Sequence, residues 1–432
     1  MYNLFKLDNG LRVVVENIEY VNSVSVGLWV ENGSRNENKA NSGISHFIEH
    51  MFFKGTENRT ALQIAECIED VGGQINAFTG KEATCFYVKA LDSYLELSLD
   101  VISDMLFNSK FSPEDIEKEK SVIIEEINMS EDSPEDVLSD LHSVAIWGDD
   151  AISLPILGTE DTVKSFTRDQ IVKYISSYYI PENSVISIAG KFDPENIEKL
   201  VEKYFGNWNS TNKKLTKYSK PEILSKNLFK KKSIEQLHIS IGIPGIETGS
   251  EDLYSLLLLS NVFGGGASSI LFQKIREEKG LCYSIYSYIS AFMNTGVVNI
   301  YTSLNPKYAA DAINMIKEEI NKFVQNGISD DKLVKAKEQL KGSYILGLES
   351  TSSRMFSNGK SVLFLNKIKT PTDLIEKINR IDRHKLEEVM QKTFAHGIIN
   401  SSFVGENIDR ELLNNILTTE IVSFKSEKSK LV

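Results

Sequence analysis

The sequence contains few cysteines, and they stand far apart. Cys67, Cys85 and Cys282 are an odd number of cysteines at unrelated spacings. This arrangement argues against a disulfide framework and against a zinc site built from thiolates. It is typical of a protein made for a reducing compartment, and we expect a cytoplasmic location.

Long hydrophobic runs are also absent. The longest apolar stretches, such as 256–259, are much shorter than the roughly 18 to 20 residues that a transmembrane helix needs. The N-terminal residues contain no basic segment followed by an apolar run, so they do not resemble a signal peptide. We therefore expect no membrane partner.

The chain has fewer positively charged residues than negatively charged ones. The chain has 48 Lys and Arg residues against 60 Asp and Glu residues, and its formal net charge is −12. Nucleic-acid binding depends on clustered Lys and Arg that face phosphates, so this balance argues against a nucleic-acid partner. An acidic surface is compatible with neutral or basic peptides as substrates, although such a surface is usually a matter of solubility alone.

The chain does contain enough apolar sequence for two domains. Its 432 residues, 41% of them hydrophobic, exceed the roughly 250 to 300 residues at which single cores stop growing. Segments that begin at Phe111 and Phe166 recur at Ile328 and Ile381, at offsets of 328 − 111 = 217 and 381 − 166 = 215 residues. Two similar offsets indicate a duplicated domain, with chance similarity of charged helices as the alternative.

Each copy mixes strands with helices, so the expected fold class is α+β, with two homologous domains, each a mostly antiparallel β-sheet flanked by α-helices. The boundaries predicted from composition are 1–212 and 227–432, joined by a Lys-, Ser- and Thr-rich linker at 213–226. In the first copy a hairpin should follow from the turn at 8–10. Strands are expected at 23–30, 74–87 and 184–189, and helices at 42–53, 61–71, 94–108, 113–129 and 168–178.

One expected helix carries a pattern typical of metal chemistry. His46 and His50 are one helical turn apart, so both imidazoles project from one face at a separation suited to one small cation. Glu49 borders the same face and can reach a metal-bound water without being a ligand. Two imidazoles and a carboxylate favour zinc, one per chain, with a fourth position open for water. The alternative is a solvated helix with incidental histidines.

The third ligand must come from elsewhere in the chain. In the helix expected at 113–129, Glu119 and Glu126 are seven residues apart and share a face. One of them can bind zinc while the other orients a histidine. At the offset of 217 these positions become Ala336 and Ser343, and the second copy contains no His-x-x-Glu-His pattern. Only the first copy therefore has the histidines and glutamates that could bind a metal.

The segment 42–56 closely resembles the zinc helix of the pitrilysin/insulinase metallopeptidases, which include the mitochondrial processing peptidases and their short bacterial relatives. The resemblance continues through 33–37, 76–79, 157–159 and 179–183 in the first copy and through 263–272 and 276–284 in the second. It departs at Ala267, where the family usually has Met, and before Leu157, where a His-Pro is common.

The resemblance implies a role for each candidate residue. His46, His50 and Glu126 would bind zinc, Glu119 would support a ligand, and Glu49 would be the general base. Arg276 would anchor the substrate backbone and Tyr283 would stabilise the intermediate, although Tyr283 could equally be a half-buried strand residue. The segment 76–79 (Asn76, Ala77, Phe78 and Thr79) would be an edge strand that binds an extended peptide.

The family also implies a clamshell that encloses short or unfolded peptides, and a dimer formed with a second copy or with a homologous subunit. Hydrolysis of peptide bonds by a zinc-activated water is then the expected function. One alternative is a catalytically silent member that acts in assembly, which should have lost some of the four residues His46, Glu49, His50 and Glu126; none is lost. Another is a non-proteolytic metal enzyme or storage site.

Overall fold

The structure, a computed structural model, describes residues 2–210 and 218–418. The chain forms two compact units, each assembled from three segments. Unit 1 comprises Met1–Asp132, Asp149–Pro221 and Lys341–Lys377; unit 2 comprises Ser133–Gly148, Glu222–Leu340 and Ile378–Val432. Within the described residues, no helix is long and apolar enough to cross a membrane.

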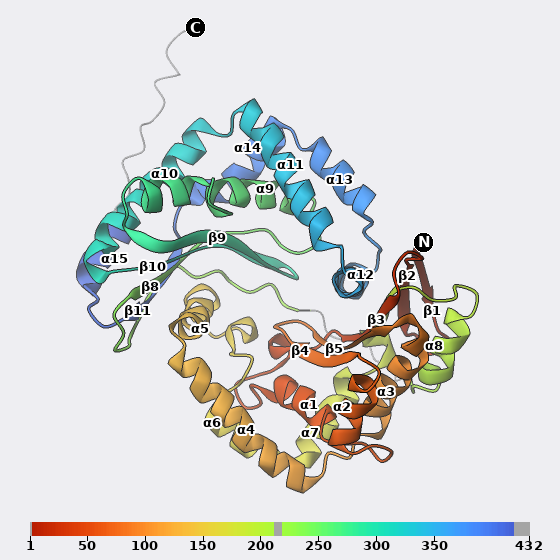
Figure 1. The fold of residues 1–432 in the computed structure, drawn as a ribbon. Helices are drawn as coiled ribbons and strands as arrows, with labels where there is room; N and C mark the ends of the chain where they lie inside the picture. Colours follow the sequence, from red (N-terminus) through yellow and green to blue (C-terminus); the bar gives the residue numbers. More distant parts are fainter. Residues whose placement is uncertain (1, 211–217, 419–432) are drawn as a thin grey trace. The chain divides into compact units, whose positions relative to one another are not determined.

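Unit 1 is built on a six-stranded sheet in the order β1-β2-β6-β3-β5-β4 (Figure 1). Every neighbouring pair is antiparallel except the parallel pair β2 and β6. The strands are β1 (Tyr2–Lys6), β2 (Arg12–Asn17), β3 (Ser23–Val30), β4 (Gln74–Thr79), β5 (Thr84–Leu91) and β6 (Ser184–Gly190). The helices are α1 (Ile44–Phe52), α2 (Ala61–Glu69), α3 (Leu95–Asn108), α4 (Pro113–Asp132), α6 (Glu160–Ser165), α7 (Arg168–Tyr178), α8 (Ile197–Phe205) and α12 (Thr351–Leu365).

Local sequence accounts for most of these elements. The expected hairpin forms between β1 and β2, where the amide of Leu7 donates to the carbonyl of Leu11 across the turn. The single strand expected at 74–87 is instead a hairpin of β4 and β5. The chain reverses at Gly80, whose amide donates to the carbonyl of Ala83 at 2.8 Å. Residues 79–82 are Thr, Gly, Lys and Glu, so the apolar alternation is interrupted there, and the prediction of one strand missed this turn signal.

One face of the sheet of unit 1 packs against α1, α3 and α7 in a large apolar core. Ile44, Phe47, Ile48 and Met51 of α1 are buried there, at the helical spacing that an amphipathic helix requires. The opposite side of α1 is thereby left to His46, Glu49 and His50, which are only partly buried. The core thus sets the direction in which the polar side chains of α1 point.

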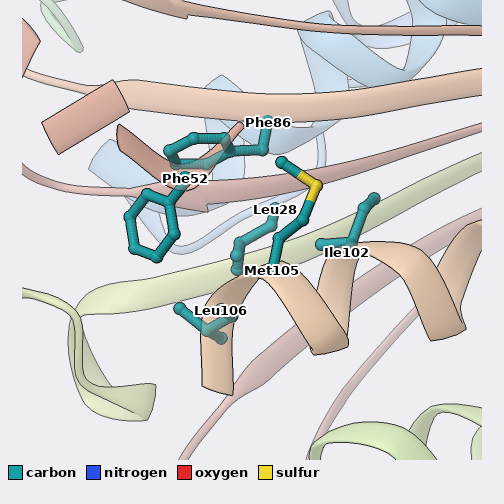
Figure 2. Close-up of a pocket in the computed structure, with 6 residues that line it drawn as sticks. All are labelled: Leu28, Phe52, Phe86, Ile102, Met105 and Leu106. Atoms are coloured by element: carbon teal, nitrogen blue, oxygen red, sulfur yellow. The ribbon is translucent and has the colours of Figure 1, made fainter. Parts of the chain in front are cut away.

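The core is closely packed below the end of α1. A void of about 10 Å³ lies between α3, the strands β3 and β5, and Phe52 of α1, and Figure 2 shows the side chains that line it. All of its lining side chains are apolar: Leu28, Phe52, Phe86, Ile102, Met105 and Leu106. A void of this size without polar partners stays dry and offers no binding site.

The other face of the same sheet is covered by α12, which comes from late in the sequence. The buried carboxylate of Glu16 accepts hydrogen bonds from Arg354 and Asn358 of α12. Gly359 allows a close approach, because a Cβ there would lie 2.2 Å from Nε1 of Trp29. The sheet of unit 1 is therefore completed by a helix from the second sequence repeat.

Unit 2 repeats the plan with a five-stranded sheet in the order β7-β11-β8-β10-β9 (Figure 1). Its one parallel pair, β7 and β11, occupies the place of β2 and β6. The strands are β7 (Asn227–Lys231), β8 (Leu237–Pro244), β9 (Cys282–Phe292), β10 (Thr295–Leu304) and β11 (Asn400–Gly405). The helices are α5 (Pro134–Trp147), α9 (Asp252–Gly264), α10 (Ala309–Asn326), α14 (Arg383–Lys392) and α15 (Arg410–Thr418), while α11 (Asp330–Gly347) and α13 (Pro371–Arg380) cross the boundary between the two units.

The sheet of unit 2 is covered by α5, which comes from the first sequence repeat. Val137 and Leu138 of α5 pack against Tyr301 and Val404. The two expected domains, 1–212 and 227–432, therefore differ from the compact units by an exchange of segments: 133–148 packs in unit 2 and 341–377 in unit 1. Of the expected linker, residues 213–217 lie outside the described residues, 218–221 belong to unit 1 and 222–226 to unit 2.

Candidate metal centre

The side chains of α1 and α4 in unit 1 meet at a group of nitrogen and oxygen atoms. Nε2 of His46 lies 3.7 Å from Oε2 of Glu126, and Nε2 of His50 lies 3.6 Å from the same oxygen. One ligand atom from each of the three residues lies within 4.8 Å of the other two. The fold thus brings residues 46, 50 and 126 together; the helical spacing predicted this for the two histidines, and the family resemblance implied it for Glu126.

The two glutamates of α4 lie on its core-facing stripe. Ile116 and Ile123 are buried, and Glu119 and Glu126 continue the same helical face at the spacing of a heptad repeat. This stripe turns both carboxylates toward α1, with which α4 is in contact. The helical period therefore explains how residues so far from the histidines in sequence reach them.

His50 is held at one of its ring nitrogens. Its Nδ1 lies 2.7 Å from Oε1 of Glu119. The other oxygen of Glu119, Oε2, forms an ion pair with Nζ of Lys54 at 2.6 Å. Burial alone would lower the pKa of His50, but the hydrogen bond to Glu119 and the charges of Glu126, Glu119 and Glu49 outweigh burial and raise it. For Glu119, the hydrogen bonds from His50 and Lys54 outweigh burial and lower the pKa. Of the two glutamates of α4, Glu119 is thus the one that is hydrogen-bonded to a histidine.

Lys54 was not singled out by the sequence patterns. It lies beyond Phe52, the last residue of α1, and its partner Glu119 is on α4, so the helical spacing gave no signal for this contact.

His46 has a different environment. Its ring centroid lies 4.5 Å from that of His50, and its Nδ1 is buried with no hydrogen-bond partner among the described residues. Burial, followed by the charge of His50, lowers the pKa of His46 to about 4. The imidazole is therefore neutral at physiological pH, which is the form that binds a metal.

Glu49 lies beside the group without belonging to it. Oγ1 of Thr79, on β4, donates a hydrogen bond to Oε2 of Glu49 at 2.5 Å. Burial raises the pKa of Glu49 and outweighs the hydrogen bond from Thr79, which acts in the opposite direction. Sequence patterns placed Thr79 on a peptide-binding strand, and the contact of its side chain with Glu49 could not be read from them.

The strand β4 that carries the segment 76–79 lies at the edge of the sheet of unit 1. It pairs with β5 on one side, and α1 is in contact with it. Asn76 and Phe78 are exposed, while Ala77 and Thr79 are half-buried. The backbone of β4 thus has one unpaired edge beside the helix that carries the histidines.

Arg276 and Tyr283 lie together in unit 2. Arg276 belongs to the π-helical segment η5 (Phe272–Glu277), and its guanidinium carbon lies 4.9 Å from the ring centroid of Tyr283 and 4.5 Å from that of Phe272. Tyr283 is on β9 at the edge of its sheet, with 76% of its surface exposed. The side chain of Tyr283 is therefore open to solvent, unlike that of a half-buried strand residue.

The donor set in unit 1 suits zinc. Ligand atoms about 2.0 to 2.1 Å from a tetrahedral zinc ion lie about 3.3 Å from one another. The separations of 3.7 and 3.6 Å between the histidine nitrogens and Glu126 approach that value without an ion in place. Two imidazoles and one carboxylate also match the ligands of catalytic zinc sites, which leave one position open.

Two family models match consecutive parts of the chain. The family model described as insulinase (peptidase family M16) matches residues 12–160, and that of the peptidase M16 inactive domain matches residues 165–340. A protein of Bacillus subtilis (strain 168) named uncharacterized zinc protease YmxG is 43% identical, over 91% of this chain and 96% of its own length. An uncharacterized zinc protease of Streptomyces coelicolor, SCO5738, is 37% identical over 86% of this chain and 83% of its own length.

The chain belongs to the insulinase family, peptidase family M16. It is similar in length and sequence to the bacterial relatives named zinc proteases, as the resemblance of the segment 42–56 predicted.

Solved structures share the fold. A protease from Helicobacter pylori superimposes with a TM-score of 0.88 at 23% identity, covering 94% of this chain and 99% of the other. A peptidase M16 inactive domain from Pseudomonas fluorescens gives the same TM-score at 16% identity, covering 94% and 98%. The expected α+β class with two repeated domains is confirmed.

Proposed function

We propose that this protein is a zinc-dependent endopeptidase with one zinc ion per chain, bound by His46, His50 and Glu126. The observation that carries the proposal is the convergence of these three side chains, with ligand atoms within 4.8 Å of one another, beside a carboxylate that is not part of the group. Names of relatives support the same activity, since those of Bacillus subtilis and Streptomyces coelicolor are called zinc proteases.

Glu49 is the proposed general base. A zinc ion bound by the three ligands would lower the pKa of a bound water to about 7 and polarise the scissile carbonyl. The carboxylate of Glu49 would accept a proton from the attacking water and pass it to the leaving amine. Two features of the site suit this role. Burial raises the pKa of Glu49, and Thr79 fixes one of its oxygens so that the other is available.

Glu119 and Lys54 are assigned a supporting role. Nδ1 of His50 donates its hydrogen bond to Glu119, which leaves Nε2 as the nitrogen that faces Glu126. Lys54 balances the charge of Glu119. Such partners fix the orientation of a ligand and raise its basicity.

The substrate is proposed to be a short or unfolded peptide that adds to β4 as an extended strand. The unpaired edge of β4 would bind the peptide through main-chain hydrogen bonds from the segment 76–79, which selects for conformation more than for one side chain. In unit 2, Arg276 would bind substrate backbone, and the exposed hydroxyl of Tyr283 would stabilise negative charge on the scissile carbonyl. We also expect a dimer, with a second copy or a homologous subunit, which its mass in solution would test.

The activity is tested with a mixture of quenched fluorescent peptides and the purified full chain. We expect cleavage that stops when a chelator removes zinc and returns when zinc is added. Glu49→Gln should retain one zinc per chain and lose about 100- to 10,000-fold in turnover, because it removes the base but no ligand. Zinc content is measured by elemental analysis and turnover by fluorescence.

The matched control is Glu66→Gln, an exposed glutamate on α2, which should leave both quantities unchanged. A second pair separates the metal ligand from its neighbour: Glu126→Gln should weaken zinc binding, and Glu125→Gln, at an exposed position of the same helix, should not. A wild-type chain that holds zinc yet cleaves no peptide would favour the silent assembly role, and a chain that takes up no zinc would overturn the metal site.

A further inference from the structure

The side chain of Glu37 reaches the start of the helix that carries the histidines. Glu37 is 5% exposed and lies just after the short helix η1 (Ser34–Asn36). Its Oε2 accepts a hydrogen bond from the backbone amide of Gly43 at 2.7 Å, and its Oε1 accepts one from the amide of Ser45 at 2.8 Å. Both oxygens of one buried carboxylate are therefore bound to the beginning of α1.

Helix α1 cannot supply this cap by itself. Its N-cap residue is Gly43, which has no side chain and a φ of 91°, in the left-handed region. A Cβ at that position would lie 2.6 Å from the carbonyl oxygen of Leu157 and 2.8 Å from Cα of Gly158. A serine, threonine or aspartate cap is thus excluded at this position, both by the backbone conformation and by the neighbouring chain.

Several other helices in the same unit are capped locally, whereas α3 and α8 have no side-chain cap. Thr60, Thr167 and Ser350 each accept a hydrogen bond from the amide three residues ahead, as N-cap residues usually do. In α1 the acceptor instead comes from outside the helix, and it is a carboxylate, the group that the positive end of a helix dipole favours. Burial opposes this choice and raises the pKa of Glu37 to about 7.

The position of the cap connects it to the metal centre. Ser45 directly precedes His46. Because His46 is the third residue of α1, its imidazole projects from the first turn of the helix. The hydroxyl of Ser45 is also held, by Nδ2 of Asn32 at 3.2 Å and by the hydroxyl of Tyr174 at 3.1 Å. A rotation or shift of this turn would move Nε2 of His46 relative to Oε2 of Glu126, 3.7 Å away.

We propose that Glu37 is a positioning residue of the metal centre, whose carboxylate fixes the first turn of α1 and thereby the place of His46 relative to Glu126. The inference deepens the proposed function and rests on it for its effect on turnover. It assigns to Glu37 an influence on metal affinity that the cap of a helix without a ligand, such as α12, would not have.

The test compares Glu37→Gln with Ser350→Ala, which removes the local cap of α12 on the opposite face of the same sheet. A glutamine presents an NH₂ group to one of the two amides, so one of the two hydrogen bonds is lost while the side-chain volume is kept. We expect Glu37→Gln to weaken zinc binding about 10- to 100-fold, the range typical of residues that hold a metal ligand in place. Ser350→Ala should reduce the melting temperature without changing zinc affinity. Affinity is measured by competition with a zinc-binding dye.

Turnover gives a second measurement at saturating zinc. Because β4 is untouched, Glu37→Gln should lower kcat and leave KM unchanged. Glu37→Ala completes the series, and circular dichroism shows which variants fold; if the alanine variant does not fold, the glutamine variant alone decides.

The outcomes separate this inference from the proposed function. A wild-type chain that binds zinc without cleaving peptides would end the peptidase proposal and leave the affinity comparison intact. Equal zinc affinity in wild type and a folded Glu37→Gln variant would overturn the role of Glu37, whatever the activity. A wild-type chain that binds no zinc would overturn both.

Discussion

The two units of the molecule share one plan, apart from the additional strand β1 of unit 1, and differ most in the residues that one pair of helices carries. In both sheets the strands follow the same order around a single parallel pair, β2 with β6 in unit 1 and β7 with β11 in unit 2. In both, the strand next in the chain, β3 or β8, leads to a helix, α1 or α9. The helices α4 and α11 begin 330 − 113 = 217 residues apart, the offset read from the sequence.

The difference lies in what these helices carry. α1 turns His46, Glu49 and His50 away from the core, whereas α9 has apolar residues around most of its surface and buries nine of its thirteen residues. The places of Glu119 and Glu126 are taken in α11 by Ala336 and Ser343. The repeated fold therefore does not need these polar side chains. In unit 1 they are held by contacts with one another and with neighbours: Thr79 with Glu49, Lys54 with Glu119, and Glu119 with His50.

The largest effect is expected when a proposed zinc ligand of unit 1 is removed and compared with the loss of a histidine in unit 2. His50→Ala removes a proposed ligand and should lower zinc affinity by about two orders of magnitude or more, with loss of turnover. The matched change in unit 2 is His238→Ala, which removes a half-buried histidine that lies 2.9 Å from the hydroxyl of Tyr301. That variant should still bind one zinc per chain, as measured by elemental analysis. Equal loss of zinc in both variants would contradict a site confined to unit 1.

A smaller effect is expected at the strand that supports Glu49. Thr79→Val keeps the shape of the side chain and removes its hydrogen bond to Glu49, so turnover should fall about tenfold, which corresponds to the roughly 1.4 kcal/mol of one such bond to a charged group. Zinc content should not change. Gln74→Ala, at an exposed position of the same strand, is the control and should have little effect. Unchanged kcat in Thr79→Val would show that Glu49 is held by packing alone.

The smallest expected effect concerns stability in unit 2, which has a buried histidine of its own. Burial lowers the pKa of His142 on α5 to about 3, and its Nδ1 lies 3.2 Å from Oγ of Ser402. The folded chain keeps this ring neutral while the unfolded chain protonates it below its ordinary pKa of 6.5. Its contribution to stability is thus present above pH 6.5 and is lost as the pH falls toward 3, with a limiting slope of about 1.4 kcal/mol per pH unit.

His142→Asn should flatten the fall in the free energy of unfolding between these pH values, as measured by denaturant titration in the presence of a chelator. The control is His384→Asn, at an exposed position of α14 in the same unit, which should leave the slope as in the wild type. An unchanged slope in His142→Asn would show that His142 is protonated in the folded chain.

Much of the candidate site followed from local sequence. The one-turn spacing of His46 and His50 and the two-turn spacing of Glu119 and Glu126 depend only on the helical period, so each pair could be placed on one face before the structure was known. The partners of these residues could not. Thr79 contacts Glu49 from 30 residues away, and Lys54, just beyond the end of α1, contacts Glu119 on α4; such contacts between elements have no local period to reveal them.

The sequence by itself determined the repeated order of elements, the single polar set and the family to which the chain belongs. Only the tertiary structure decided that α5 covers the sheet of unit 2 and α12 that of unit 1, because each helix comes from the other sequence repeat and no local pattern specifies a partner so far along the chain. It also decided that α1 is capped by Glu37, since the crowding around Gly43 that prevents a local cap arises from Leu157 and Gly158, far along the chain.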